Sequence, residues 1–174
     1  MTRIWFINTM FSMAYLIDGH NLIPKIRGLS LESADDEMQL IELLQEFCRR
    51  RRKTVEVFFD NAPPGQPRAR VFGRVKARFV RQEQTADQAI EHRLEQLGGA
   101  RRNFIVVSSD RQVQEAARAR GVKSISGETF ASTLQEALHP SATENELRAE
   151  LALRPEEVED WLAMFGSEQG EGEE

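Results

Sequence analysis

Residues 14–23 read Ala-Tyr-Leu-Ile-Asp-Gly-His-Asn-Leu-Ile, and the folded part of the chain is expected to begin with them. Residues 14–17 are apolar and stop at Asp18-Gly19, a pair that favours a turn. A short apolar run that ends at turn residues predicts a buried β-strand. Asp18 is therefore expected at the carboxyl end of the first strand of a sheet.

Strand and helix patterns alternate after this stretch. Further strands are expected at residues 54–59, 71–81, 104–107 and 122–125. Helices are expected from a capping box at residues 33–36 to the basic run 49–53, from Thr85 to Leu97, between Asp110 and Gly121, and over residues 128–138. Strands that alternate with helices predict an α/β fold, doubly wound, with a mainly parallel sheet and right-handed crossovers.

The two ends of the chain depart from this alternation. Residues 1–12 are expected to be an extension or a misplaced start, because polar residues interrupt their apolar run and no signal-peptide cleavage site follows. Residues 13–139 are expected to form the main domain. Residues 140–165 are predicted to form a small helical C-terminal extension, and the Gly/Glu-rich residues 166–174 a disordered acidic tail.

Composition excludes several classes of protein. The chain has 174 residues and no apolar run of the ~18 residues that a membrane-spanning helix needs, so no membrane association is expected. Its single cysteine, Cys48, excludes a disulfide framework and lies on an apolar helical stripe, where a core position is expected. The three histidines are far apart in the sequence. A bound metal would therefore have mainly oxygen ligands, which favours Mg²⁺ or Mn²⁺ over zinc.

Charge is distributed unevenly along the chain, whose net charge is −5. Residues 49–81 contain eleven basic and two acidic residues, whereas residues 141–174 contain eleven acidic and two basic ones. The basic stretch could therefore attract a polyanion although the whole chain is acidic. The predicted strand 71–81 alternates, which would put its cations on one face to contact the phosphate backbone of a nucleic acid. The residues expected to make these contacts are Arg68, Arg70, Arg74, Lys76 and Arg78.

Four aspartates are expected at one edge of the sheet. Asp18, Asp60 and Asp110 each come at or just after the end of a predicted strand, and Asp87 begins the helix that follows the basic strand. The carboxyl ends of parallel strands form the ligand crevice of an open α/β sheet. Converging carboxylates repel each other, and a divalent cation such as Mg²⁺ or Mn²⁺ would neutralise them. An alternative remains open, in which Asp18 is a turn residue and Asp110 a helix N-cap.

The chain resembles the YacP-like NYN domains at four motifs, which are Tyr15–Ile23, Val57–Asp60, Thr85–Asp87 and Val107–Asp110. Glu157–Trp161 also resembles the C-terminal helix of that family. The resemblance implies a PIN-like fold and a metal-dependent endoribonuclease that cleaves messenger RNA in association with ribosomes. Matched position by position, it implies that Asp18, Asp60, Asp87 and Asp110 are metal ligands, with Asn21 and Ser109 in support. The chain departs from the family at His20, where tyrosine is commoner.

One further acidic residue, Glu91, lies one helical turn after Asp87 and could face the same site. The residues and the resemblance together predict a cytoplasmic endoribonuclease that hydrolyses RNA phosphodiester bonds with Mg²⁺ or Mn²⁺, with RNA and the ribosome as partners. An alternative is a non-cleaving RNA- or ribosome-binding module on the same fold. A phosphoacceptor receiver domain is disfavoured, because Asp18 stands alone where such a domain has an acidic pair.

Overall fold

The computed structural model describes residues 13–32, 35–81 and 83–139. The chain divides into two units, Met1–Leu138 and His139–Glu174, and nearly all described residues belong to the first. The predicted N-terminal extension, the C-terminal helices and the acidic tail lie outside the described residues. Among the described helices, none is long and apolar enough to cross a membrane.

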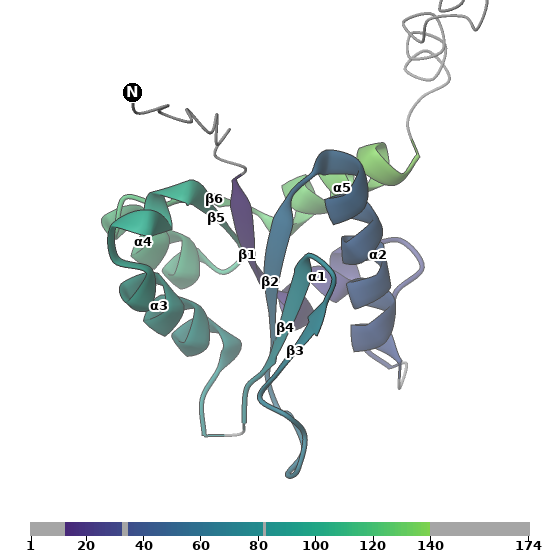
Figure 1. Cartoon of the computed structure of the whole chain (residues 1–174), viewed down its shortest axis with the longest axis horizontal. Helices are drawn as coiled ribbons and strands as arrows, with labels where there is room; N and C mark the ends of the chain where they lie inside the picture. The colour runs from purple at the N-terminus through teal and green to yellow at the C-terminus, as the bar shows by residue number, and fades with distance from the viewer. Residues whose placement is uncertain (1–12, 33–34, 82, 140–174) are drawn as a thin grey trace, which may run out of the picture. The chain divides into compact units, whose positions relative to one another are not determined.

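A six-stranded sheet runs through the centre of the first unit (Figure 1), with the strand order β3-β4-β2-β1-β5-β6. Every neighbouring pair is parallel except β3 and β4. The strands are β1 (Ala14–Asp18), β2 (Thr54–Phe59), β3 (Ala69–Phe72), β4 (Val75–Phe79), β5 (Phe104–Val107) and β6 (Lys123–Ile125). The predicted α/β class with a mainly parallel sheet is confirmed.

Helices cover both faces of the sheet (Figure 1). Helices α2 (Asp36–Arg51) and α5 (Gly127–Leu138) lie on one face, and α3 (Ala86–Leu97) and α4 (Arg111–Ala119) lie on the other. Short helical turns complete the unit, and they are α1 (Gly19–Leu22), η1 (Ile23–Lys25) and η2 (Gly98–Asn103).

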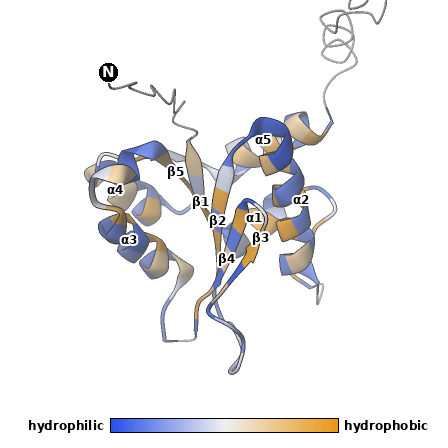
Figure 2. Cartoon of the chain, in the orientation of Figure 1, coloured by the Kyte–Doolittle hydropathy of each residue, from blue (hydrophilic) through white to orange (hydrophobic). Residues whose placement is uncertain are grey.

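The core has two layers because strand side chains alternate between the faces. In β2, Val57 and Phe59 are buried with Phe47 of α2, whereas Phe58 is buried with Ile90 of α3. Figure 2 shows that the helices carry both hydrophilic and hydrophobic residues, as amphipathic helices packed on a sheet do. The predicted core position of Cys48 is confirmed, since its exposed fraction is 1%.

The turn after β1 depends on a glycine. A Cβ atom at Gly19 would lie 2.4 Å from Cε1 of Phe59 and 3.0 Å from the carbonyl oxygen of Phe58. Helix α1 therefore begins in direct contact with β2, at a distance that no larger residue allows without movement. This contact explains why glycine follows Asp18.

The prediction of a single strand over residues 71–81 is wrong. This region is the end of β3, a turn at Gly73 with a positive φ of 60°, and the antiparallel strand β4. Gly73 reverses the chain because it adopts the left-handed conformation without steric cost. Val71, predicted to face the same way as Val75, Ala77 and Phe79, is instead 69% exposed. Within β4 the predicted alternation holds, with Val75, Ala77 and Phe79 buried.

Two predicted helix starts have different outcomes. Helix α3 begins with the predicted capping box, in which Gln88 N–H donates to Oγ1 of Thr85 (3.2 Å) and Thr85 N–H donates to Oε1 of Gln88 (3.2 Å). Helix α2 begins later than predicted, with Asp35 as N-cap and Asp36 as the first helical residue. Ser33, the predicted cap, lies outside the described residues.

Candidate functional site

The four predicted aspartates lie at the carboxyl edge of the sheet. Asp18 ends β1, Asp60 directly follows β2, and Asp110 follows β5 and caps α4, while Asp87 lies in the first turn of α3. Strands β2, β1 and β5 are parallel neighbours, so their carboxyl ends point to the same edge. The side chains of Asp18 and Asp87 are close enough for each to affect the pKa of the other.

The electrostatics of these carboxyls show how closely they interact. Burial first, and then the negative charges of Asp87 and Asp60, raise the pKa of Asp18 to about 6, against a backbone hydrogen bond from Asn21 that lowers it. Burial also raises the pKa of Asp87, together with the charge of Asp110. Each of the four carboxyls thus acts electrostatically on another, with the pair Asp18 and Asp87 at the centre.

The donor atoms fit a hard divalent cation. Oδ1 of Asp87 is buried and has no hydrogen-bond partner among the residues that the structure describes. An unpaired carboxylate oxygen in a buried position is costly, and a cation would supply the missing partner. The side chains are not gathered into a closed cage, since no group of three or more His, Cys, Asp or Glu residues in the described part of the chain is placed to hold a metal ion. Mg²⁺ and Mn²⁺ suit such an open site because they retain water ligands.

Asp18 and Asp110 also cap helices, as the alternative interpretation expects. Oδ1 of Asp18 accepts a hydrogen bond from Asn21 N–H (3.2 Å), and Oδ1 of Asp110 accepts one from Gln112 N–H (2.7 Å). Each cap uses Oδ1, and Oδ2 has no hydrogen bond among the described residues. Capping and cation binding are therefore compatible at both positions.

Asp60 has a cationic neighbour in His20. Nδ1 of His20 pairs with Oδ1 of Asp60, and Nε2 lies 3.3 Å from Oε1 of Glu37 at the start of α2. The hydrogen bond to Glu37 and the pairing with Asp60 raise the pKa of His20 to about 9, although burial acts in the opposite direction. His20 is thus a positive charge between two carboxylates. Sequence reasoning did not find Glu37, because its contact depends on where α2 starts in space.

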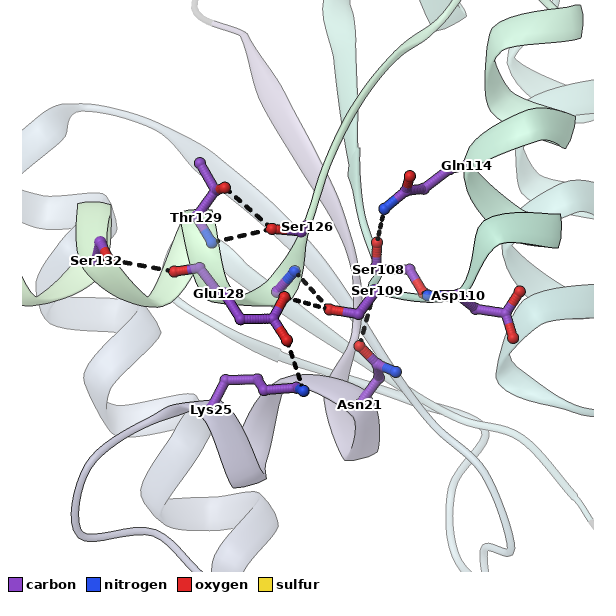
Figure 3. Close-up of polar contacts among 11 residues, drawn as sticks. Asn21, Lys25, Ser108, Ser109, Asp110, Gln114, Ser126, Glu128, Thr129 and Ser132 are labelled. Carbon is purple, nitrogen blue, oxygen red and sulfur yellow. Dashed lines mark hydrogen bonds and ion pairs between the residues drawn. The ribbon is translucent and has the colours of Figure 1, made fainter.

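Asn21 and Ser109 belong to one hydrogen-bond network (Figure 3). Oδ1 of Asn21 accepts from Ser109 N–H (2.9 Å), and Oγ of Ser109 donates to Oε2 of Glu128 (2.6 Å) and accepts from Gly127 N–H (3.0 Å). Nζ of Lys25 lies 2.6 Å from Oε1 of Glu128. This contact with Lys25 is the largest of the causes that lower the pKa of Glu128 to about 2. The network joins α1, η1, the loop after β5 and α5.

This network holds one side of the acidic edge in place. Figure 3 shows the carboxylate of Asp110 pointing away from the network. Asn21 and Ser109 therefore fix the backbone from which Asp110 projects. Their supporting role stays a prediction. Sequence reasoning missed Lys25 and Glu128, whose pairing has no local sequence signal.

Glu91 points toward α4 and pairs with Arg120, whose Nη2 lies 3.3 Å from Oε2 of Glu91. Its charge still contributes to the raised pKa of Asp87. Glu91 therefore acts on the edge through its charge, while its own contact is an interhelical ion pair.

The predicted RNA-contacting cations do not share one face. Arg68 and Arg78 line a cavity of about 400 Å³ between β4 and α3, whereas Arg74 lines a separate hollow of about 470 Å³ beside α2. Arg70 lies over the ring of Phe72, 5.4 Å from its centroid. The expectation that Arg74 shares a face with Lys76 and Arg78 is wrong, because Arg74 lies in the hairpin turn and not within a strand.

Helices on both faces of a mainly parallel sheet, with acidic residues at its carboxyl edge, define a PIN-like α/β protein. The chain belongs to the YacP-like NYN domain family, whose model matches residues 15–164. This is a family of PIN-like nucleases, so membership indicates a nuclease or RNA-related function and RNA as the class of partner. PIN-like NYN nucleases generally use divalent metals.

Solved structures support the fold. The crystal structure of Rae1 (YacP) from Bacillus subtilis is similar to this chain with a TM-score of 0.63 at 23% sequence identity, covering 88% of this chain and 92% of that one. A tryptophan-to-leucine mutant of the same protein gives a TM-score of 0.59 at 23% identity, covering 82% and 85%. No protein of curated function matches the chain. The predicted PIN-like fold and family are confirmed.

Proposed function

We propose that the chain is a divalent-metal-dependent endoribonuclease that hydrolyses RNA phosphodiester bonds, with messenger RNA on cytoplasmic ribosomes as its setting. The observation that carries the proposal is the buried Oδ1 of Asp87, which lacks a hydrogen-bond partner among the described residues and belongs to a carboxyl that interacts electrostatically with Asp18. Family membership supports the nuclease class.

The proposed roles follow from the positions of the side chains. Asp18, Asp60, Asp87 and Asp110 would hold Mg²⁺ or Mn²⁺. When bound, the cation supplies Lewis acidity and neutralises negative charge at the scissile phosphate. Asn21 and Ser109 keep the loop before Asp110 in position, and Glu91 adds negative charge near Asp87.

The RNA strand would be held by cations of the β3–β4 hairpin and of the loop before it. We assign contacts with its phosphates to Arg68, Arg70, Arg74, Lys76 and Arg78. Phosphate contacts of this kind give affinity without sequence selection and weaken as salt is added. The choice of cleavage site would then depend on the setting of the RNA, such as a translating ribosome.

The test is cleavage of an end-labelled RNA, offered free and on translating ribosomes, with Mg²⁺ or Mn²⁺. We expect wild type to cut it and both Asp18→Asn and Asp87→Asn to lose at least ~100-fold in rate, as for removal of a principal charge-stabilising group. Glu136→Gln on α5 is the matched control, because Glu136 is exposed and has no contact with the acidic edge.

The ends of the products identify the chemistry. Hydrolysis assisted by divalent metal should leave 5′-phosphate and 3′-hydroxyl ends, whereas 2′,3′-cyclic phosphate ends would contradict the proposal. RNA that stays intact but bound in both settings would instead favour the non-cleaving RNA- or ribosome-binding module.

A further inference from the structure

The cavity between β4 and α3 has a wall of sheet residues and a wall of helix residues. Its volume is about 400 Å³, within the ~300–1,000 Å³ that is typical of small-molecule sites. The sheet wall includes Phe58, Arg78 and Phe79, and the loop that joins β4 to α3 adds Arg81 and Gln84. A site of this size suits one nucleotide unit.

One of the three faces of helix α3 lines the cavity. Ile90 and Leu94 are buried, and Glu91 pairs with Arg120, the residue that follows α4. The third face lines the cavity and consists of Ala89, His92, Arg93 and Gln96, at helical spacing. Within this stripe Arg93 is held by Glu56 of β2, while His92 and Gln96 bond only each other among the described residues, so these two side chains are available to a ligand.

The two walls are joined by an ion-pair cluster of net positive charge. Glu56 of β2, whose side chain is 13% exposed, bonds Arg78 through Nε (2.8 Å) and Arg93 through Nη2 (2.6 Å). One carboxylate thus fixes two guanidinium groups from opposite walls and neutralises only one. Arg78 uses only Nε, so its terminal nitrogens have no hydrogen-bond acceptor among the described residues. Arg68 and Arg81 also line the cavity, and their two positive charges outweigh the single negative charge of Glu83.

The cavity begins beside the acidic edge. Val80 N–H donates to the carbonyl of Phe59 (2.7 Å), and Ala62 N–H donates to the carbonyl of Val80 (3.0 Å). The sheet wall therefore ends next to the segment that carries Asp60. On the helix wall, Ala89 lies within one turn of Asp87. An RNA strand that enters the cavity would therefore continue toward the carboxylates of Asp60 and Asp87.

We propose that this cavity binds one nucleotide of a single-stranded RNA, with its phosphate on the cations and the adjoining phosphodiester at the acidic edge. The proposal rests on the proposed ribonuclease function and names the form of its substrate. A strand can place a whole nucleotide between two walls only where its bases are unpaired, whereas a duplex presents its backbone and keeps its bases stacked inside. Single strands are therefore preferred over duplexes.

The test is binding of a short fluorescent RNA in the presence of EDTA, measured by fluorescence anisotropy as a single strand and as a duplex. We expect the single strand to bind more tightly. Arg81→Gln should weaken its binding by ~3–10-fold and reduce the slope of log K against log salt by ~0.7, the change for one phosphate contact on a single strand. The control is Lys123→Gln, on β6 at the opposite edge of the sheet, which also removes one positive charge. It should leave the affinity and the salt dependence unchanged.

His92→Ala tests the helix wall without breaking one of its ion pairs. It should weaken binding of the single-stranded RNA but not of the duplex. Equal effects of Arg81→Gln and Lys123→Gln, or equal affinity for single strand and duplex, would overturn the proposal. A mononucleotide that competes as well as the oligonucleotide would also overturn it, because the ligand would then be a free nucleotide and not a strand.

Cleavage by the same variants separates this proposal from the ribonuclease function. If wild type cuts RNA while Arg81→Gln and Lys123→Gln bind alike, the cavity proposal alone fails. The opposite result has wild type and all variants failing to cut RNA, while Arg81→Gln weakens binding of the single strand but not of the duplex. The cavity proposal then stands and the ribonuclease function fails.

Discussion

The carboxyls of Asp18 and Asp87, both at the carboxyl edge of the sheet, each affect the pKa of the other. Asp18 is at the end of β1 and Asp87 in the first turn of α3, so this interaction joins two segments far apart in the sequence. Two neighbouring carboxylates destabilise each other when both are ionised. The fold therefore carries an electrostatic cost at neutral pH that a bound cation would remove.

Asp18→Asn should raise the melting temperature of the metal-free protein by ~3–6 °C near pH 8. The folded-state pKa of Asp18, about 6, is above its ordinary value of 3.8, so the folded wild type binds more protons. Wild type should therefore lose stability as the pH rises from about 4 through 6, and the variant should lose less. Asparagine keeps the cap on Asn21, because its amide oxygen can accept the same hydrogen bond.

The measurement is thermal unfolding in EDTA across this pH range, with Glu136→Gln as the control variant. The advantage of Asp18→Asn should shrink as the pH falls toward 4 and disappear well below pH 3.8, where the wild-type carboxyl is protonated in both states. An advantage that does not depend on pH would mean that repulsion between the carboxylates is not its cause.

Mn²⁺ or Mg²⁺ should stabilise wild type and should stabilise Asp87→Asn much less. A ligand that binds only the folded state raises stability by mass action, by about 2.7 kcal/mol at a concentration of ~100 Kd. Asp87 supplies the buried oxygen that lacks a partner among the described residues, so its loss should abolish most of this effect. Thermal unfolding against metal concentration tests this, and equal shifts in both proteins would place the cation elsewhere.

Gly19→Ala should destabilise the fold by ~1–3 kcal/mol, the usual cost of overpacking a core. The added Cβ would lie 2.4 Å from the ring of Phe59, which is itself fully buried and has little room to move. Gly99→Ala is the matched control, since a Cβ there has no neighbour within 4 Å. Urea unfolding measures both. A Gly19→Ala variant as stable as Gly99→Ala would show that α1 can move away from β2 at little cost.

His20 should remain protonated well above neutral pH. Glu37 first and then Asp60 raise its pKa to about 9, from an ordinary value of 6.5. The stability that this pairing contributes is complete below about pH 6.5 and is lost as the pH rises through 9. NMR titration of the ring should give a midpoint near 9, and a lower midpoint in Glu37→Gln. An unshifted wild-type midpoint would contradict the pairing.

The parts of the fold that the sequence predicts are those encoded locally. The β1 strand ends at Asp18, and α3 starts at the Thr85–Gln88 box, because each signal consists of neighbouring residues. The hairpin is not evident from the alternating pattern, because Gly73 fits that pattern as a strand residue, whereas its freedom at positive φ makes it the turn.

The missing parts of the candidate site are pairings between distant segments. His20 with Glu37 and Glu56 with Arg93 depend on how α2 and α3 pack, and no local pattern encodes that packing. One signal was present, since Glu56 interrupts an otherwise apolar stretch of β2. A charged residue in a buried strand needs a partner, which pointed to a cation on the neighbouring helix.

Glu56→Gln should weaken folding and strengthen RNA binding. Burial would raise the pKa of Glu56, but hydrogen bonds from Arg93 and Arg78 outweigh burial and keep the pKa below its ordinary value. Glutamine removes the charge that holds the two guanidinium groups together, so we expect a loss of ~1–3 kcal/mol in unfolding free energy. The same change frees one positive charge in the cavity, which should tighten single-stranded RNA binding several-fold at low salt.

Urea unfolding and fluorescence anisotropy in EDTA measure the two effects on the same preparation. Glu136→Gln again removes one exposed negative charge outside the cavity, and it should change neither quantity much. A purely structural role for Glu56 predicts that stability and RNA binding fall together, because the cavity walls would move apart. Opposite signs in the two measurements would therefore show that the cluster restrains cations that the RNA uses.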